Sequence, residues 1–412
     1  MRLLALAERQ LEPVLPRALI EVALGNARGA LGFLRTDVPR ALEVLGEDPA
    51  RADALAATGR LIVATAHFVA FLESRLTAAD ASFALGEADF LRFLAETEGI
   101  DLDLAQIESR CDAEIARDSA ALARAARAVD PSRDVASVVA EVLADRPPAA
   151  EVLAVAREQL RTLRAITEAS VASIPSSDHL LVAESPAYMR EAFAWFVASG
   201  PLEPAPVESF FYVTSPGPSW PAQRQREFLP PRVTLLALSA HEGYPGHFLH
   251  TLWVRRIPSR TQRALAEIAS VITSEAWATY AEEIAWEASE RDPRVNIGQL
   301  GDSLTRAGRC KAAIGLHVRG WSAPQAARTI REVSHTPQAI AAEEALRGTY
   351  DPMYLGYTLG KAEIRALREE LRARAQREGR AFSEREFHDT FMSFGAAPLS
   401  AIREAMLSDA ND

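Results

Sequence analysis

The sequence predicts a mainly α-helical protein with at most one small β-sheet. Alanine, leucine, arginine and glutamate dominate the 412 residues, and all four favour helix. Apolar residues recur at intervals of three and four, as in Leu61, Ala64 and Phe68. We therefore expect a multi-helix fold, with no internal repeat of fixed period.

Proline divides the helical pattern into segments. Residues 1–145 are expected to form several helices, and Pro147-Pro148 precedes another helix at 149–173. A short helix is predicted at 186–198. From Val233 helix is expected almost to the end of the chain.

The strand candidate is Val207–Thr214, where aromatic and β-branched residues cluster. Our interpretation is an N-terminal helical region, 1–148, followed by a second helical region, 149–412, in one continuous structural unit.

Composition and charge restrict the partners and the location. The net charge of −11 argues against nucleic acid as the main partner, because phosphate binding needs clustered Lys and Arg. Cys111 and Cys310 have no spacing typical of a metal or redox motif, so two reduced core thiols are expected. The apolar run at the N-terminus is interrupted at Glu8, and we expect no membrane-spanning segment. A cytoplasmic protein without a membrane partner is predicted.

Three of the eight histidines fall within the segment HEGYPGHFLH at 241–250. In the zinc signature H-E-x-x-H, two histidines one helical turn apart bind the metal and the Glu activates water. Here six residues separate His241 from His247, which corresponds to about 240° around a regular helix. Pro245 prevents a regular helix, because its ring clashes with the carbonyl of His241. A loop at 243–246 could therefore return His247 to the position of the second ligand.

The third ligand candidate is Glu275, on the apolar face of a helix expected to begin near Gln262. A carboxylate about thirty residues after two histidines completes a His-His-Glu zinc site. Glu282 lies two turns further along the same face. It is either a carboxylate that orients a ligand histidine or an alternative ligand. Glu283 is expected to face solvent.

At these residues the chain resembles the domain of unknown function 885 family, bacterial proteins grouped with the gluzincin-like zinc metallopeptidases. Four blocks match in order across roughly 180–412: HEGYPGH at 241–247, SEAWATYAEE at 274–283, GLHVRGWSAPQA at 315–326, and YLGYTLGKAEIRALRE at 354–369 with EFHDTFMSFGAAPL at 386–399. The chain departs from the family pattern at His250, Ala276 and Ala313, none of which is an inferred ligand.

The resemblance implies a gluzincin-like fold and one zinc ion per chain, bound by His241, His247 and Glu275. It also implies that Glu242 is the general base. A developing oxyanion needs a second donor besides the metal. The candidates are His317, Tyr354 and Tyr357, of which Tyr357 matches the family tyrosine best.

Lys361 and Arg368 share a helix face with Tyr357. Either could bind a substrate carboxylate, which would favour carboxypeptidase or dipeptidase action. A surface role is the alternative.

The sequence thus predicts a zinc hydrolase, and more specifically a metallopeptidase acting on a peptide or peptide-like amide. One alternative is a non-catalytic helical binding protein that retains the fold. Another is a zinc hydrolase of a non-peptide amide or ester.

Overall fold

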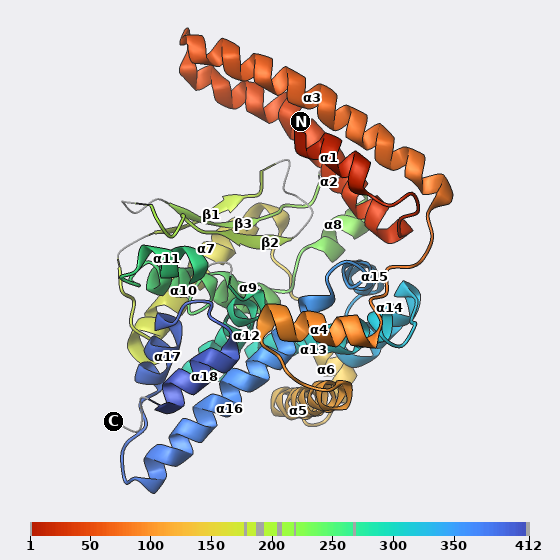
Figure 1. Ribbon diagram of the computed structural model, residues 1–412. Coiled ribbons are helices and arrows are strands. Elements are labelled where there is room, and N and C mark those ends of the chain that lie inside the picture. Colours follow the sequence, from red (N-terminus) through yellow and green to blue (C-terminus); the bar gives the residue numbers. More distant parts are fainter. Residues whose placement is uncertain are drawn as a thin grey trace. The chain divides into compact units, whose positions relative to one another are not determined.

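The computed structural model describes residues 2–176, 179–186, 193–203, 208–217, 220–266 and 269–408 (Figure 1). The chain divides into two compact units. The first is Met1–Ala84 with Ser185–Ala192, and the second is Leu85–Glu184 with Phe193–Asp412. This division does not coincide with the boundary predicted at 148, because the helices between 85 and 148 belong to the second unit.

The first unit is a helical hairpin made of α2 (Arg17–Ala41) and α3 (Pro49–Arg75), drawn in red and orange in Figure 1. The helix α1 (Arg2–Gln10) packs against α3, and the 3₁₀ turns η1 (Leu42–Leu45) and η2 (Leu76–Ala78) follow α2 and α3. Buried leucine, isoleucine and valine side chains hold the hairpin together: Ile20, Leu24, Val69 and Leu72.

The stretch Pro49–Ala78 is long and apolar enough to cross a membrane, with a mean hydropathy of 1.6 in its most apolar window, of which 11% is buried. Arg60 and His67 interrupt this stretch, so the expectation that no segment spans a membrane stays a prediction. The finding concerns length and composition alone.

The second unit begins with four helices, two of which have a side-chain cap at the first turn. These are α4 (Glu87–Glu98), α5 (Leu104–Val129), α6 (Val135–Val142) and α7 (Val152–Ile166), with the short turns η3 (Ala149–Glu151) and η4 (Thr167–Val171) beside α7. Asp103 and Gln106 form a capping box on α5, and Asp134 caps α6.

A three-stranded sheet follows, with strands β1 (Leu180–Glu184), β2 (Ala194–Val197) and β3 (Ser209–Val213) in the order β1-β3-β2. The strand β3 pairs in parallel with β1 and antiparallel with β2. The strand predicted at 207–214 is confirmed within the described residues. The helix predicted at 186–198 is wrong at 194–197, because Trp195, Phe196 and Val197 favour extended backbone and pair with β3; residues 187–192 lie outside the described residues.

The remaining chain is helical, as predicted: α8 (Ala222–Phe228), α9 (Arg232–Glu242), α10 (His247–Val254), α11 (Arg260–Ala266), α12 (Val271–Ala288), α13 (Pro293–His317), α14 (Ala323–Ser334), α15 (Gln338–Arg347), η6 (Pro352–Leu355), α16 (Gly356–Arg377), α17 (Glu384–Ser393) and α18 (Leu399–Ser408). The helix that carries Glu275 begins at Val271 and not near Gln262, because Ser270 caps it by accepting a hydrogen bond from the Thr273 N–H. The mainly helical class with one small sheet is confirmed.

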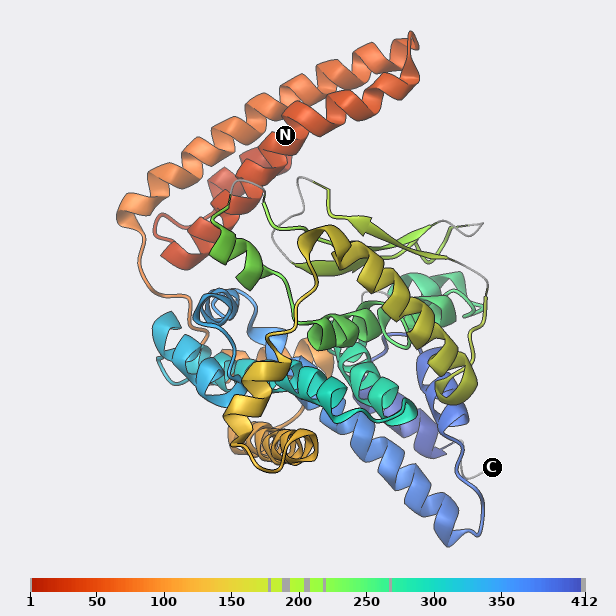
Figure 2. The same cartoon turned by 180° about the vertical axis from the view of Figure 1, so that it is seen from behind.

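Two helices form the framework of the second unit (Figures 1 and 2). The helix α13 packs against α5, α9, α14 and α16, and α12 packs against α9 and α16. The contact between α12 and α16 is close because glycines lie in it. A Cβ atom at Gly360 would lie 2.3 Å from the Cβ atom of Ala276, and one at Gly356 would lie 2.3 Å from Ile272.

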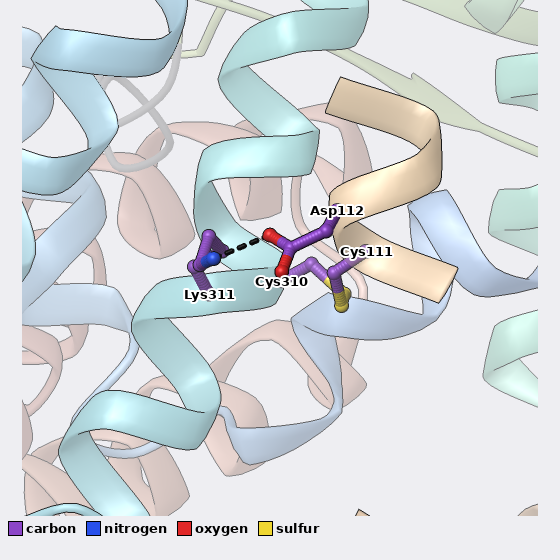
Figure 3. Close-up of a disulfide and its surroundings, with 4 residues drawn as sticks. All are labelled: Cys111, Asp112, Cys310 and Lys311. Carbon is purple, nitrogen blue, oxygen red and sulfur yellow. Dashed lines mark hydrogen bonds and ion pairs between the residues drawn. A yellow bond between two sulfur atoms is a disulfide. The ribbon is translucent and has the colours of Figure 1, made fainter. Parts of the chain in front are cut away.

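The two cysteines form a disulfide bond between α5 and α13 (Figure 3). Their Cα atoms are 6.0 Å apart although 199 positions separate them in sequence. The expectation of two reduced thiols is therefore wrong, since packing of the two helices brings together residues whose sequence spacing carries no signal. Asp112 and Lys311, the next residue on each helix, form an ion pair beside the bond.

Candidate metal centre

A sharp turn at Gly243–Gly246 separates α9 from α10, as predicted from Pro245. The Gly246 N–H donates to the carbonyl oxygen of Ala240 at 2.9 Å, which closes the turn against the last turn of α9. A Cβ atom at position 246 would lie 1.9 Å from the His241 carbonyl oxygen, so only glycine allows this approach. On the other side, the buried Trp277 indole N–H donates to the Pro245 carbonyl at 3.0 Å and ties the turn to α12.

The turn brings His241, His247 and Glu275 together. One possible ligand atom from each residue lies within 4.8 Å of the other two. The Oε2 atom of Glu275 is 3.3 Å from His241 Nε2 and 3.4 Å from His247 Nε2. The two imidazole rings are nearly perpendicular, with centroids 4.8 Å apart.

These residues fit a zinc ion. Two ligands at about 2.0–2.1 Å from one tetrahedral zinc are about 3.3 Å apart, which matches both spacings from Glu275. Glu275 Oε2 is also buried with no hydrogen-bond partner among the described residues, as expected of an atom whose partner is an ion. Burial would raise the pKa of Glu275, but the two neighbouring imidazoles outweigh it and hold that pKa well below its usual range.

Glu282 supports the first histidine from the side opposite the cluster. Its Oε1 atom is 2.8 Å from His241 Nδ1, as the interpretation of an orienting carboxylate requires. Arg306 of α13 in turn holds Glu282, with Nη1 2.9 Å from Oε1, and Asp302 lies 2.6 Å from the same Nη1. The chain Asp302–Arg306–Glu282–His241 is buried and connects α13, α12 and α9.

Glu242 lies in the last turn of α9 and is 8% exposed. Burial raises its pKa, an effect that the nearby His241 and His247 oppose. A carboxylate with a raised pKa beside a metal site is suited to accept and return a proton near neutral pH. Glu242 is not one of the three residues of the cluster.

Tyr357, at the start of α16, lies against the first ligand histidine. Its ring stacks on the His241 ring at a centroid distance of 6.4 Å with 10° between the planes. Its hydroxyl oxygen accepts a hydrogen bond from Arg347 Nη2 at 3.2 Å. Because arginine can only donate, the phenolic proton remains free to donate elsewhere. Burial raises the pKa of Tyr357, so the proton stays on the oxygen.

The other two oxyanion candidates are placed differently. Tyr354 in η6 is buried, and its hydroxyl has no hydrogen-bond partner among the described residues. The His317 Nε2 atom lies 2.7 Å from the Gly348 carbonyl oxygen, and its ring stacks on Phe90. These contacts are typical of a packed structural histidine and give no support to a catalytic role for His317.

Lys361 and Arg368 are both held by acidic or polar side chains of the protein itself. Lys361 is 1% exposed, and its Nζ atom donates to Asp118 at 3.0 Å and to Ser303 at 2.5 Å. Arg368 donates to Glu384 at 2.7 Å and to Glu287 at 2.9 Å. Both cations form ion pairs that join α16 to neighbouring helices. These contacts give no support to the substrate-binding prediction for the two residues.

Glu283 belongs to the same buried network and does not face solvent, contrary to expectation. It pairs with Arg117 and lies 3.5 Å from Arg365 Nη1. The charge partners of Glu283 lie on α5 and α16. Helix periodicity within α12 carries no information about residues on other helices, so these partners could not be inferred from the sequence.

Aromatic and polar neighbours surround the second histidine. Phe196 of β2 stacks on His247 at a centroid distance of 6.3 Å, and Ser274 Oγ is 3.4 Å from His247 Nδ1. A cavity of about 190 Å³ opens beside them, lined among others by His250 and Thr251. The edge strand of the sheet thus lies directly against a metal-ligand candidate.

Fold and cluster together define a mainly helical protein with a candidate His-His-Glu metal centre. The chain belongs to the DUF885 family of bacterial proteins of unknown function, whose model matches residues 2–406. The family match therefore extends well beyond the part of the chain, roughly 180–412, in which the four blocks lie.

Two solved structures have a similar fold. One is a protein of unknown function from Shewanella oneidensis, provisionally described as a lipoprotein; it is 20% identical, with a TM-score of 0.74 over 95% of this chain and 73% of that chain. The other, from Colwellia psychrerythraea and also provisionally described as a lipoprotein, is 19% identical, with a TM-score of 0.79 over 97% of this chain and 70% of that chain. No curated protein matches the sequence.

Proposed function

We propose that this protein is a zinc-dependent hydrolase that cleaves peptide bonds. The observation that carries the proposal is the spacing of Glu275 Oε2 from the two histidine Nε2 atoms, 3.3 and 3.4 Å, beside the buried carboxylate of Glu242. A binding protein that had merely kept the fold would have no need for a buried acid next to a complete ligand set.

When bound, Zn²⁺ would act as a Lewis acid on the substrate carbonyl and lower the pKa of a nearby water. Glu242 accepts a proton from the attacking water and then delivers it to the leaving amide nitrogen. The Tyr357 hydroxyl donates to the developing oxyanion, since its proton is not used by Arg347. Glu282 keeps the Nε2 atom of His241 turned toward the cluster.

The neighbouring sheet favours a peptide over other amides. In the order β1-β3-β2, the strand β2 has an outer edge, and its Phe196 stacks on His247. Extended peptides bind sheet edges through main-chain hydrogen bonds, with alternate side chains entering pockets. A substrate paired with β2 would have its backbone beside the metal ligands.

The test is digestion of a peptide library by zinc-loaded wild-type protein and by Glu242→Gln, with products identified by mass spectrometry. We expect cleavage by the wild type and a loss of at least about 100-fold in the variant. Zinc binding at one equivalent without cleavage of any peptide would support the binding-protein alternative. Turnover of esters or non-peptide amides alone would support the alternative of a zinc hydrolase with a non-peptide substrate.

We also assign the protein to a compartment where disulfides persist, in place of the cytoplasm predicted from the sparse cysteines. The Cys111–Cys310 bond supports this assignment, because reducing compartments keep thiols free. The two proteins with the similar fold are provisionally described as lipoproteins, which agrees with it.

A further inference from the structure

Arg347 is the last residue of α15, and one nitrogen of its guanidinium is not engaged by the described residues. The Nε and Nη2 atoms face Asp351 Oδ2 at 2.9 and 2.8 Å, and Nη2 also donates to the Tyr357 hydroxyl. Among the residues that the structure describes, Nη1 has no partner. The side chain as a whole is 33% exposed.

The Tyr357 ring lies between the guanidinium of Arg347 and His241, a candidate metal ligand. The guanidinium carbon of Arg347 is 5.5 Å from the centroid of the Tyr357 ring, and that ring stacks on His241. A substrate whose carbonyl oxygen accepts from the Tyr357 hydroxyl therefore has its next residue within reach of Arg347, since successive residues are about 3.8 Å apart.

The other cations near Tyr357 are already paired. Arg306 is bound by Glu282 and Asp302, and its side chain is 5% exposed. Arg309 donates to Glu344 at 2.6 Å, and its side chain is 12% exposed. Lys361 and Arg368 are held in the ion pairs described above. Arg347 is thus the most exposed of these arginines beside Tyr357, and its Nε and Nη2 atoms are held by Asp351.

Asp351 fixes Arg347 without blocking it. The carboxylate takes the Nε side of the guanidinium, and this holds the plane of the group in place before any ligand arrives. The remaining N–H groups can then bind a second carboxylate with little loss of side-chain entropy.

We propose that Arg347 binds the free C-terminal carboxylate of a peptide substrate, which makes the protein an exopeptidase of the carboxypeptidase type. The inference rests on the proposed function, because it requires a scissile peptide bond at the His-His-Glu cluster. A terminal carboxylate on Arg347 places the last peptide bond of the substrate next to Tyr357 and the metal ligands. An internal segment of a long chain has no such group to offer.

The experiment uses two libraries of N-acetylated tetrapeptides with identical sequences, one ending in a carboxylate and the other in a carboxamide. Zinc-loaded wild-type protein should release C-terminal residues from the acids at least about 10-fold faster than from the amides. Arg347→Gln should lower kcat/KM for the acids about 10- to 100-fold more than for the amides, because a charged hydrogen bond is lost only with the acids. Arg347→Lys, which keeps the charge, should recover part of the preference. Arg328→Gln, on the exposed face of α14, should keep the wild-type ratio of the two rates.

Equal cleavage of both libraries by the wild type overturns the inference and leaves the proposed function standing. A loss in Arg347→Gln that is the same for acids and amides also overturns it, since Arg347 then serves only to hold Tyr357.

A binding measurement decides the question if the wild type cleaves neither library and the proposed function fails. Glu242→Gln protein is equilibrated by dialysis with both libraries, and the retained peptides are counted by mass spectrometry. Enrichment of the acids that disappears in Glu242→Gln/Arg347→Gln supports carboxylate recognition at Arg347. Equal retention of acids and amides, or an acid enrichment that survives in the double variant, overturns it.

Discussion

The Nδ1 atom of His241 lies 2.8 Å from Oε1 of Glu282, and this contact decides which ring nitrogen faces the cluster. Because a carboxylate only accepts, Nδ1 carries a proton toward Glu282, and Nε2, 3.3 Å from Glu275, is the nitrogen left to face a metal ion. Burial lowers the pKa of His241, but the nearby carboxylates of Glu275 and Glu282 outweigh it and raise that pKa to about 10. A cation at the cluster must therefore compete with a proton on Nε2.

We expect Glu282→Gln to weaken zinc binding about 10- to 100-fold, because the amide orients the His241 ring less firmly than the carboxylate. Competition with a chromophoric chelator measures the affinity. Glu290→Gln, an exposed acid just beyond the end of α12, is the matched control. Equal zinc affinity of wild type and Glu282→Gln would mean that Glu282 serves only to pair with Arg306.

Glu275→Ala and Glu242→Gln should separate metal binding from chemistry. Removing the Glu275 carboxylate takes away one ligand oxygen, so the zinc content of purified protein should fall well below one equivalent per chain. Glu242→Gln should keep about one equivalent and lose hydrolysis. Elemental analysis and a peptide assay on the same samples test both. Wild-type turnover in Glu242→Gln would mean that Glu242 is not the general base.

Gly246→Ala should abolish zinc binding, because the new Cβ atom would lie 1.9 Å from the His241 carbonyl oxygen and force the turn to open. Gly301→Ala is the control, since a Cβ atom there meets nothing within 4 Å, and alanine should stabilise that helix by about 0.5–1 kcal/mol. Zinc titration and thermal unfolding of both variants check this. A zinc-binding Gly246→Ala protein would show that the turn tolerates a side chain.

Reduction of the Cys111–Cys310 bond should lower the melting temperature. The bond closes a loop of 199 residues, for which chain entropy predicts a stabilisation of up to about 5 kcal/mol. The comparison is thermal unfolding of wild type with and without reductant, with Cys111→Ser as the reference that does not respond. Rapid alkylation of both thiols in the untreated native protein would contradict the bond.

His388 should make the fold sensitive to acid. Burial lowers its pKa to about 4, and its Nδ1 atom bonds the Val171 carbonyl at 2.9 Å. Because the folded pKa lies below the unfolded value, the stability is present above about pH 6.5 and is lost as the pH falls toward 4. The free energy of unfolding should drop by about 2 kcal/mol between pH 7 and 5 from this residue. Denaturant unfolding of wild type and His388→Gln at both pH values tests the difference, which should be smaller in the variant.

Most of the metal cluster could be predicted from local sequence signals. The Pro245 signal is a backbone constraint, so it predicts the break between α9 and α10 without knowledge of the rest of the fold. Helix periodicity likewise places Glu275 and Glu282 on one face. Arg306 was missed because it supports Glu282 across helices, and no spacing within α13 marks it as a partner.

Long-range charge pairing caused the largest errors. Lys361 shares a helix face with Tyr357 as predicted, but that face meets Asp118 of α5, which lies 243 positions earlier in the chain. A cation on an otherwise suitable face is equally compatible with a substrate or with a buried acid. Only the packing of α5 against α16 distinguishes the two, and periodicity contains no information about it.

Glu275 lies on α12 and Tyr357 on α16, and these two helices pack closely through glycines of α16. Gly360 and Ala276 face each other so closely that a methyl group added at 360 has no room, and Gly356 meets Ile272 in the same way. The methyl group of Ala276 occupies the space that a side chain at 360 would need. The volumes at 276 and 360 should therefore be exchangeable: an alanine at 360 becomes tolerable when 276 is glycine. The double substitution Ala276→Gly/Gly360→Ala would move a methyl group from α12 to α16. We expect the packing of the two helices, and with it the position of Tyr357 relative to the metal ligands, to stay the same.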